Sequence, residues 1–382
     1  MLKRFSCLLL IFLICVLPIK AEADDNVGSE PLSLSAKSAI LICADTGKPL
    51  YSKNENQRLP MASTTKIMTA LLTFERTQSS DREVEITDQM VRVEGSSMGL
   101  LPGNVITLKN LAKGMMMCSG NDAANSIAIA IAGSNDKFCE LMNEKAKLIG
   151  MNDTNFATAS GLNRDDHYST ARDMAILGAY AMENKEFYDT VKCKTIKVPF
   201  IKPNESRTYR NHNKLLWQYK DCVGIKTGFT EKAGRCLVSC VEKDGLRLVA
   251  VTLNAHSDWD DHKKLYDYGF SKVSLVRLEP LSEDISINVV GSDKSSISAN
   301  VKMEKTVTVN NEDANRITST IEVPQFLNAP IEKGQVVGKV IYYLDDNIIA
   351  TNELISNDLA EYKYEQKGFF DRIANFFVHM FS

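Results

Sequence analysis

Three short motifs whose residues are suited to acyl transfer occur along the chain in a fixed order. They are Ser63-Thr64-Thr65-Lys66, Ser119-Gly120-Asn121 and Lys226-Thr227-Gly228. Each motif is common by itself, but together they supply a serine nucleophile, a lysine base, a proton relay and a cation that could hold a carboxylate. This combination predicts an enzyme that opens an amide bond through an acyl-serine intermediate.

The first motif supplies the nucleophile and its base. Ser63 opens an apolar pattern of helical spacing over residues 61–75, which places Lys66 one turn later and beside the serine hydroxyl. A lysine acts as a base only where burial or a neighbouring cation lowers its pKa, and Lys226 is the candidate neighbour. A second match to the Ser-x-x-Lys pattern, at residues 134–137, is interpreted as a turn and helix cap. The alternative for Ser63 is a capping role without catalysis.

The second motif offers a proton relay. Ser119 lies between an apolar run at residues 115–118 and a helical pattern that begins near Asn121, so both polar side chains could project into a cleft. Ser119 is the candidate donor of a proton to the leaving amine. Asn121 is the candidate ligand of a substrate amide and of Lys66. The alternative is that Ser119 only caps the helix.

The third motif is the most specific of the three. Lys226 supplies a positive charge and Thr227 a hydroxyl, and both suit a terminal carboxylate. Gly228 would let a substrate backbone approach the strand closely. The expected oxyanion donors are the backbone N–H groups of Ser63 and Phe229.

One segment rich in histidine and aspartate, residues 256–262, has the composition of a metal site. Its carboxylates precede a helical pattern, however, and are predicted to cap that helix instead. The chain contains no Cys-x-x-Cys or His-Glu-x-x-His pattern. We therefore predict neither a metal nor a cofactor.

The elements that would position these residues predict an α+β catalytic domain over residues 30–276. A hairpin at residues 37–51 and a second at 235–254 supply antiparallel strands, and Lys226 falls where an edge strand would lie beside the second hairpin. The helical patterns cover residues 61–75, 136–148 and 171–184, and one more begins near Asn121.

The composition changes after residue 277. Short β-like runs separated by turn residues predict a small all-β sandwich domain over residues 280–362. The clearest of these runs are residues 285–290, 306–309, 316–323 and 336–344.

Both ends of the chain carry predicted targeting segments. Residues 1–23 have a basic start, an apolar run and small residues for cleavage, so they are predicted to be a signal peptide. The apolar run of about 13 residues is shorter than the ~20 that span a bilayer, and a retained signal anchor is the alternative. Residues 366–382 place their phenylalanines on one helical face, which predicts an amphipathic helix lying on the membrane surface. The alternative is a terminal helix packed on the β domain or on another subunit.

Charge and cysteine content narrow the function classes. The formal net charge is −3 and becomes −5 without residues 1–23, which carry three cations and one anion. With no basic block, this acidity argues against nucleic acid as a partner. Two of the nine cysteines lie in residues 1–23. The remaining seven are interpreted as mostly free, packed thiols in reducing or anaerobic surroundings, and one to three disulfides are the alternative.

The segments around the motifs resemble those of the D-alanyl-D-alanine carboxypeptidases, which are low-molecular-mass penicillin-binding proteins. The resemblance rests on residues 61–70, 118–125, 168–175 and 223–230 and on the order of the predicted domains. It implies a catalytic domain like those of β-lactamases and penicillin-binding proteins. It also implies removal of the terminal D-alanine from peptidoglycan pentapeptide stems at the outer face of the cytoplasmic membrane. β-Lactam antibiotics would acylate the same serine, Ser63.

Two positions depart from the pattern of some relatives. His212 occupies a place where some carry arginine near the substrate carboxylate, and Phe229 follows the third motif where some carry histidine. Both leave the mechanism intact and put the finer substrate preference in question.

Three other functions stay open at this point. A class A β-lactamase would carry a Glu-x-x-x-Asn element, and we find none between residues 125 and 221. A peptidoglycan DD-endopeptidase or transpeptidase would differ only in what occupies the leaving or accepting site. An inert penicillin-binding wall module would not need intact Ser63, Lys66 and Lys226.

Overall fold

The structure is a computed structural model that describes residues 32–278 and 284–363. The predicted signal peptide, residues 1–23, and the predicted anchor helix, residues 366–382, lie outside the described residues.

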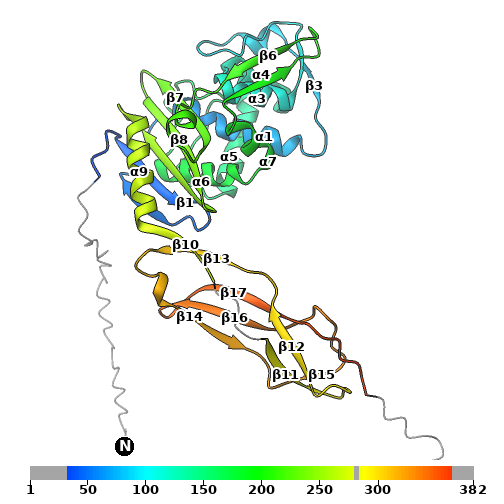
Figure 1. The fold of residues 1–382 in the computed structure, drawn as a ribbon. Coiled ribbons are helices and arrows are strands. Elements are labelled where there is room, and N and C mark those ends of the chain that lie inside the picture. The colour runs from blue at the N-terminus through cyan, green and yellow to red at the C-terminus, as the bar shows by residue number, and fades with distance from the viewer. Residues whose placement is uncertain (1–31, 279–283, 364–382) are drawn as a thin grey trace, which may run out of the picture. The chain divides into compact units, whose positions relative to one another are not determined.

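A five-stranded antiparallel sheet forms the centre of the catalytic part, in the strand order β2-β1-β9-β8-β7 (Figure 1). Its strands are β1 (Ser38–Cys43), β2 (Pro49–Lys53), β7 (Cys222–Thr230), β8 (Gly234–Lys243) and β9 (Leu246–Leu253). Both predicted hairpins are confirmed as β1–β2 and β8–β9. The strand that carries Lys226, β7, lies at the edge of the sheet as predicted, so one side of its backbone is open to a cleft.

Helices cover both faces of this sheet. Gly178 of α6 (Ala171–Met182) lies against the side chain of Val249, whereas Gly269 of α9 (Asp258–Lys272) lies against Leu248. Successive residues of a strand point to opposite faces, so α6 and α9 pack on opposite sides of β9. The acidic residues predicted to cap a helix lie in the first turn of α9, at Asp258, Asp260 and Asp261.

Six further helices gather with α6 in one buried apolar cluster. They are α1 (Lys66–Arg76), α2 (Asp88–Val91), α3 (Leu108–Cys118), α4 (Asn121–Ala132), α5 (Asn135–Leu148) and α7 (Lys185–Val191). The short helix α8 (Leu215–Gln218) lies beside β7. The predicted helical segments are thus confirmed. The segment predicted at residues 171–184 corresponds to α6, which ends at Met182, and α7 follows as a separate helix. Two small two-stranded sheets were not predicted. One pairs β3 (Glu83–Glu85) with β4 (Val105–Thr107), and the other is the hairpin of β5 (Thr195–Pro199) with β6 (Ser206–Arg210).

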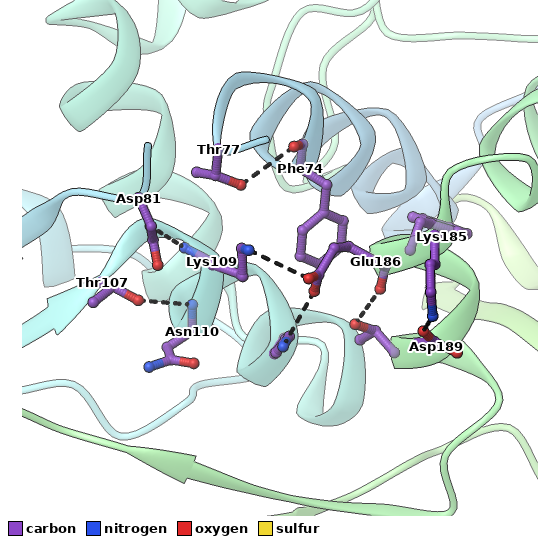
Figure 2. Close-up of polar contacts among 12 residues, drawn as sticks. Phe74, Thr77, Asp81, Thr107, Lys109, Asn110, Lys185, Glu186 and Asp189 are labelled. Carbon is purple, nitrogen blue, oxygen red and sulfur yellow. Dashed lines mark hydrogen bonds and ion pairs between the residues drawn. The ribbon is translucent and has the colours of Figure 1, made fainter. Parts of the chain in front are cut away.

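The helix that ends beside the second motif, α3, is held at its start by polar contacts (Figure 2). The Thr107 hydroxyl accepts a hydrogen bond from the N–H of Asn110 and caps the helix. Lys109 and Lys113 both pair with Glu186 of α7, each at 3.3 Å. These contacts fix α3, and therefore the position at which the chain leaves it for Ser119.

The C-terminal part is built on a six-stranded sheet in the order β14-β16-β17-β12-β11-β15. Its strands are β11 (Ile285–Val290), β12 (Ser296–Val301), β14 (Ile317–Glu322), β15 (Phe326–Asn328), β16 (Val336–Leu344) and β17 (Asn347–Ser356). The remaining strand, β13 (Thr306–Asn310), pairs with β10 (Val273–Arg277) rather than with this sheet. Within residues 284–363 the one helical segment is a short 3₁₀ turn at Ala314–Arg316, so the prediction of an all-β domain is confirmed.

Across residues 32–278 and 284–363, no helix combines the length and the hydropathy that crossing a bilayer requires.

Candidate active site

Ser63 lies in a 3₁₀ turn, Ala62–Thr65, directly before α1. The helix was expected to include Ser63, but the α-helical hydrogen bonding begins only at Lys66. In a 3₁₀ turn the side chains at positions i and i+3 eclipse one another. The Lys66 Nζ atom accordingly lies 2.9 Å from the Ser63 Oγ atom. The predicted pairing of serine and lysine is present, and it is produced by a tighter turn.

Lys66 is fully buried, and each hydrogen-bonding position of its Nζ atom has a partner. Nζ lies 2.7 Å from Asn121 Oδ1 and 2.6 Å from the Ser160 carbonyl oxygen, in addition to its contact with Ser63. Burial and, next, the positive charge of Lys226 hold the pKa of Lys66 well below its usual value. A neutral amine has two N–H groups and one lone pair. It can donate to Asn121 and Ser160 while the lone pair faces the Ser63 hydroxyl.

Ser119 lies at the end of α3 with a left-handed backbone, at φ 61°. A non-glycine residue in this region costs of order 1–3 kcal/mol and is often found at functional sites. The Lys226 Nζ atom donates to Ser119 Oγ at 3.0 Å and to the Thr227 carbonyl at 2.8 Å. Burial lowers the pKa of Lys226 to about 8. The second and third motifs are therefore joined by one hydrogen bond.

Asn121 is fixed from both ends of its amide. Its Oδ1 atom accepts from Lys66, and its Nδ2 atom donates to the Glu94 carbonyl at 2.7 Å. The neighbouring Asp122 holds the loop in front of α4, because its carboxylate accepts the backbone N–H groups of Met98 and Leu100. This loop also contains Ser96, which lines the cavity beside Ser63.

Gly228 brings the backbone of β7 against the serine turn. A Cβ atom at this position would lie 2.9 Å from the backbone nitrogen of Ser63 and 3.0 Å from the Met61 carbonyl oxygen. No ordinary Cβ contact is that short, so only glycine fits here without a shift. The close approach places the end of β7, including Phe229, beside the N–H of Ser63.

Two supporting residues, Ser160 and His167, were not predicted as part of the site. The Ser160 carbonyl oxygen accepts a hydrogen bond from Lys66. His167 is buried and is hydrogen-bonded to the backbone of the segment that leads to Ser160. The Nδ1 atom of His167 accepts the N–H of Ala157, so the Nε2 atom carries the proton in the neutral ring and donates to Thr65 Oγ1 at 2.8 Å. No pattern around residue 160 signals this role, since a backbone carbonyl can come from any residue.

An open cavity of about 830 Å³ lies in front of these groups. Ser63, Ser119, Thr227 and Gly228 line it at its base. Phe229, which is 65% exposed, lies at its rim. All eight residues predicted for the site are thus brought together, either at the cavity or directly behind it. They are Ser63, Lys66, Ser119, Asn121, Lys226, Thr227, Gly228 and Phe229.

The histidine- and aspartate-rich segment makes ordinary structural contacts. Asp258 pairs with Arg235 at 2.7 Å, and Asp261 accepts hydrogen bonds from the hydroxyl and the N–H of Ser35. His262 is buried between the hydroxyls of Ser239 and Thr252. Among the described residues, no group of three or more histidine, cysteine, aspartate or glutamate side chains is arranged to hold a metal ion.

Two further sequence interpretations agree with the structure. Ser134 caps α5 by accepting the N–H of Lys137, as predicted for the second Ser-x-x-Lys match. The seven cysteines within the described residues are all free thiols.

Comparison with known proteins agrees with this geometry over nearly the whole chain. A family profile described as D-alanyl-D-alanine carboxypeptidase matches residues 25–257, and one described as the C-terminal domain of penicillin-binding protein 5 matches residues 279–361. The D-alanyl-D-alanine carboxypeptidase DacF of Bacillus subtilis is 32% identical over 370 residues, covering 93% of this chain and 94% of the relative. DacC of Escherichia coli is 32% identical over 390 residues, covering 97% and 94%.

Solved structures give the same result. Penicillin-binding protein 5 from Haemophilus influenzae has a TM-score of 0.66 at 29% identity and covers 87% of this chain and 100% of its own. The Streptomyces K15 DD-transpeptidase has a TM-score of 0.60 at 29% identity and covers 64% of this chain and 99% of its own.

The fold and the Ser63–Lys66 pair together define a serine acyl-transferring enzyme of the penicillin-binding type. Within that class, the chain belongs to the D-alanyl-D-alanine carboxypeptidase family. It is a serine-type carboxypeptidase, as the sequence predicted.

Proposed function

We propose that Ser63 is the nucleophile that attacks the carbonyl carbon between the last two D-alanines of a peptidoglycan pentapeptide stem, and that Lys66 is its base. The observation that carries this proposal is the threefold coordination of the Lys66 amine. Its N–H groups can donate to Asn121 Oδ1 and to the Ser160 carbonyl oxygen, and its third hydrogen-bonding position faces the Ser63 hydroxyl at 2.9 Å. Burial and the charge of Lys226 lower the pKa of Lys66, which favours the neutral amine that can accept the serine proton.

The leaving amine needs a proton when the amide carbon–nitrogen bond breaks. Ser119 is the proposed donor, because its hydroxyl lies in the cavity and accepts a hydrogen bond from Lys226. The positive charge of Lys226 makes the Ser119 hydroxyl a better acid and attracts the substrate's terminal carboxylate. The Thr227 hydroxyl is the proposed hydrogen-bond donor to that carboxylate.

The negative charge that develops on the carbonyl oxygen requires fixed donors. The close approach of Gly228 to the serine turn supports the N–H groups of Ser63 and Phe229 in this role. Loss of one such donor typically costs about 10²–10³ in rate. Water then hydrolyses the acyl-serine, with Lys66 as the proposed base for this step as well. Asn121 would hold the amide of the acyl half of the substrate.

The proposal extends to inhibition and location. β-Lactams would form the same acyl bond with Ser63 and remain there, because their leaving group stays attached. Residues 1–23 would direct export, and residues 366–382 would hold the enzyme at the outer face of the cytoplasmic membrane as an amphipathic helix. The family membership supports the cell-wall substrate, and the sequence pattern supports the two targeting segments.

A labelling experiment tests the assignment of the nucleophile. Fluorescent penicillin should label the protein once per chain, and mass spectrometry of the digested protein should find the adduct on Ser63. An adduct on another residue, or full labelling of Ser63→Ala, would show that the nucleophile has been assigned incorrectly.

A further inference from the structure

One end of the C-terminal β domain exposes a group of large apolar side chains. Each of them keeps more than a third of its surface exposed, and they are Val290, Val323, Phe326, Val336, Leu359 and Tyr362. We call these six residues the apolar tip. Large groups of exposed apolar side chains are uncommon on proteins that stay in water, and they often mark a contact surface.

Backbone pairing brings together the tip residues of β11 and β15. Val290 is paired with Asn328 in a parallel register. Two positions earlier in both strands, Asn288 is paired with Phe326. Residues two positions apart in a strand point to the same face of the sheet. Val290 and Phe326 therefore lie on one face, which is opposite to the face that buries Val289.

Val323 and Val336 extend the tip onto β14 and β16. Val336 is the first residue of β16 and is paired with Ile355, near the end of β17. Val323 directly follows β14, and its side chain lies 2.7 Å from the Cβ position of Gly338 in β16. The opposite end of β16 and β17 is the turn that joins them, where Ile348 is 62% exposed.

The tip also includes the segment in which the described chain ends. Tyr362 forms a β-bridge with Ser292, which lies just after β11. The N–H of Lys363 donates to the Gly291 carbonyl oxygen at 2.8 Å. Leu359 belongs to the same segment, which leaves the sheet at this end (Figure 1). The described chain therefore ends at the apolar tip.

Charged residues of both signs surround the tip. Lys294 is paired with Asp358 at 3.0 Å, and Glu332 is next to Lys333 in the turn before β16. Because these charges balance, the tip does not select a strongly acidic or a strongly basic partner. Its apolar side chains, and not its charge, define what it can bind.

The position of the tip points to a lipid surface as the partner. The described chain ends at Lys363, and the predicted amphipathic helix begins three residues later, at residue 366. Three residues reach at most about 10 Å, and an amphipathic helix lies about 5–10 Å deep in the headgroup region of a bilayer. The tip therefore stays next to the bilayer whenever that helix is bound. Tyr362 combines a ring with a hydroxyl, which is favoured at membrane interfaces.

Resting on the proposed function, we propose that the apolar tip is a second membrane contact, which inserts among lipid headgroups when residues 366–382 bind the same bilayer. A single helix on a short link leaves the β domain free to tilt, whereas two contacts fix its tilt against the bilayer. Each tip side chain is partly covered by the protein, so the tip is too weak to hold the protein by itself. Its contribution is to strengthen the binding that the helix begins.

Binding to vesicles tests the inference on the exported form of the chain, residues 24–382. The vesicles consist of phosphatidylcholine and phosphatidylglycerol, and sedimentation gives the apparent Kd. We expect Phe326→Ser/Leu359→Ser to raise the apparent Kd about tenfold, the size expected when two half-exposed apolar side chains lose their contact with lipid. Because the charges around the tip balance, this ratio should persist at high salt.

The matched control is Met303→Ser/Ile348→Ser. Both residues are exposed apolar side chains of the same domain outside the tip, at 65% and 62% exposure. This control should leave the apparent Kd unchanged. An equal rise in the control and in the tip variant would overturn the inference, because any loss of exposed apolar surface would then weaken binding.

A tryptophan placed in the tip gives a direct readout of insertion. The emission of Phe326→Trp should shift to the blue on binding and be quenched by lipids that are brominated in their acyl chains. Ile348→Trp should show neither change. Trp217 and Trp259 are present in both variants, so their contribution cancels.

The other outcomes separate the tip from the anchor. An unchanged apparent Kd in Phe326→Ser/Leu359→Ser, with no quenching of Phe326→Trp, would overturn the inference and leave the proposed anchor intact. So would loss of self-association in solution without a change in vesicle binding, since the tip would then be an interface between copies of the chain. Removal of residues 366–382 with no loss of vesicle binding would overturn the proposed anchor, and this inference with it.

Discussion

Lys226 donates a hydrogen bond to Ser119 at 3.0 Å, although the two residues are 107 positions apart in the chain. Lys226 comes from the edge strand β7, and Ser119 from the left-handed turn between α3 and α4. The same ammonium group lowers the pKa of Lys66, which lies beside Ser63. The three motifs are therefore coupled electrostatically, and the pH dependence of acylation can be predicted from their charged groups.

Acylation of Ser63 by penicillin should follow a bell-shaped dependence on pH. Lys66 acts as a base in its neutral form, so the rate should rise as the pH passes its lowered pKa. Lys226 acts in its charged form, and its pKa is about 8, so the rate should fall above about pH 8. Stopped-flow acylation between pH 5 and 10 measures both limbs. In Lys226→Arg, the fall at high pH should move to higher pH because arginine keeps its proton. An unmoved alkaline limb would assign that limb to another group.

Replacing the base should slow acylation with the fold retained. Lys66→Ala removes the amine that lies 2.9 Å from Ser63 Oγ, and we expect a loss of about 10²–10⁴ in the acylation rate constant. The matched control is Lys137→Ala, which alters the second Ser-x-x-Lys segment at an exposed helix position. Its acylation should match that of the unaltered protein. Near-normal acylation in Lys66→Ala would rule out Lys66 as the base.

A single methyl group at Gly228 should disrupt the site. The new Cβ atom would lie 2.9 Å from the backbone nitrogen of Ser63, so the strand and the serine turn would have to separate. We expect acylation to fall by about 10²-fold or more and the free energy of unfolding to drop by about 1–3 kcal/mol. Gly47→Ala is the control: nothing lies within 4 Å of its Cβ position, and its positive φ makes the change only locally strained. If both variants kept normal acylation, close packing at Gly228 would not matter for catalysis.

Buried His167 should make the protein less stable in mild acid. Burial lowers the pKa of His167 to about 4, whereas an unfolded histidine titrates near 6.5. The unfolded chain therefore binds a proton first, so this contribution to stability is fully present above pH 6.5 and is lost as the pH falls toward 4. Its full size is up to about 3 kcal/mol.

The variant His167→Gln isolates that contribution. It should be less stable than the unaltered protein at pH 7, because the contacts of the ring with Thr65 and Ala157 change. It should also lose less stability between pH 7 and pH 5. Urea unfolding at several pH values measures the difference, and His262 contributes equally to both proteins. Identical pH dependence in the two would contradict the assignment of a neutral buried ring.

Deleting residues 366–382 should release the protein from membranes and leave D-alanine release nearly unchanged. The phenylalanine-rich face is proposed to insert at the membrane surface, whereas the catalytic groups lie between Ser63 and Phe229. Sedimentation with membrane vesicles tests the first expectation and the peptidase assay the second. A truncated protein that still sediments with vesicles would require another anchor, such as a retained segment at residues 1–23.

Much of the site could be predicted from the sequence because its polar groups come from contiguous motifs. Ser63 and Lys66 are one turn apart, and Lys226, Thr227 and Gly228 are neighbours on one strand. Local spacing was thus enough to predict that these residues form the site. It placed Ser63 in the helix itself, however, and not in the 3₁₀ turn before it.

The residues that sequence reasoning missed act through tertiary contacts. The Ser160 carbonyl oxygen accepts a hydrogen bond from Lys66, which is 94 positions away in the chain. Because every residue has a backbone carbonyl, the residue type at position 160 does not indicate this role. His167 resembles any buried histidine until its partners Thr65 and Ala157 are known. The hairpin β5–β6 has mostly exposed residues and few large apolar side chains, so it lacks the β-rich apolar runs by which the hairpin β1–β2 was predicted.

The most direct test of the account is release of D-alanine from a pentapeptide stem by the unaltered protein beside Ser63→Ala. We predict that the unaltered protein releases one D-alanine from each pentapeptide stem and that the variant releases none. The variant should still unfold at nearly the same temperature. Release by Ser63→Ala at a comparable rate would contradict the central role of Ser63. No release by the unaltered protein, with penicillin still bound at Ser63, would contradict the carboxypeptidase function.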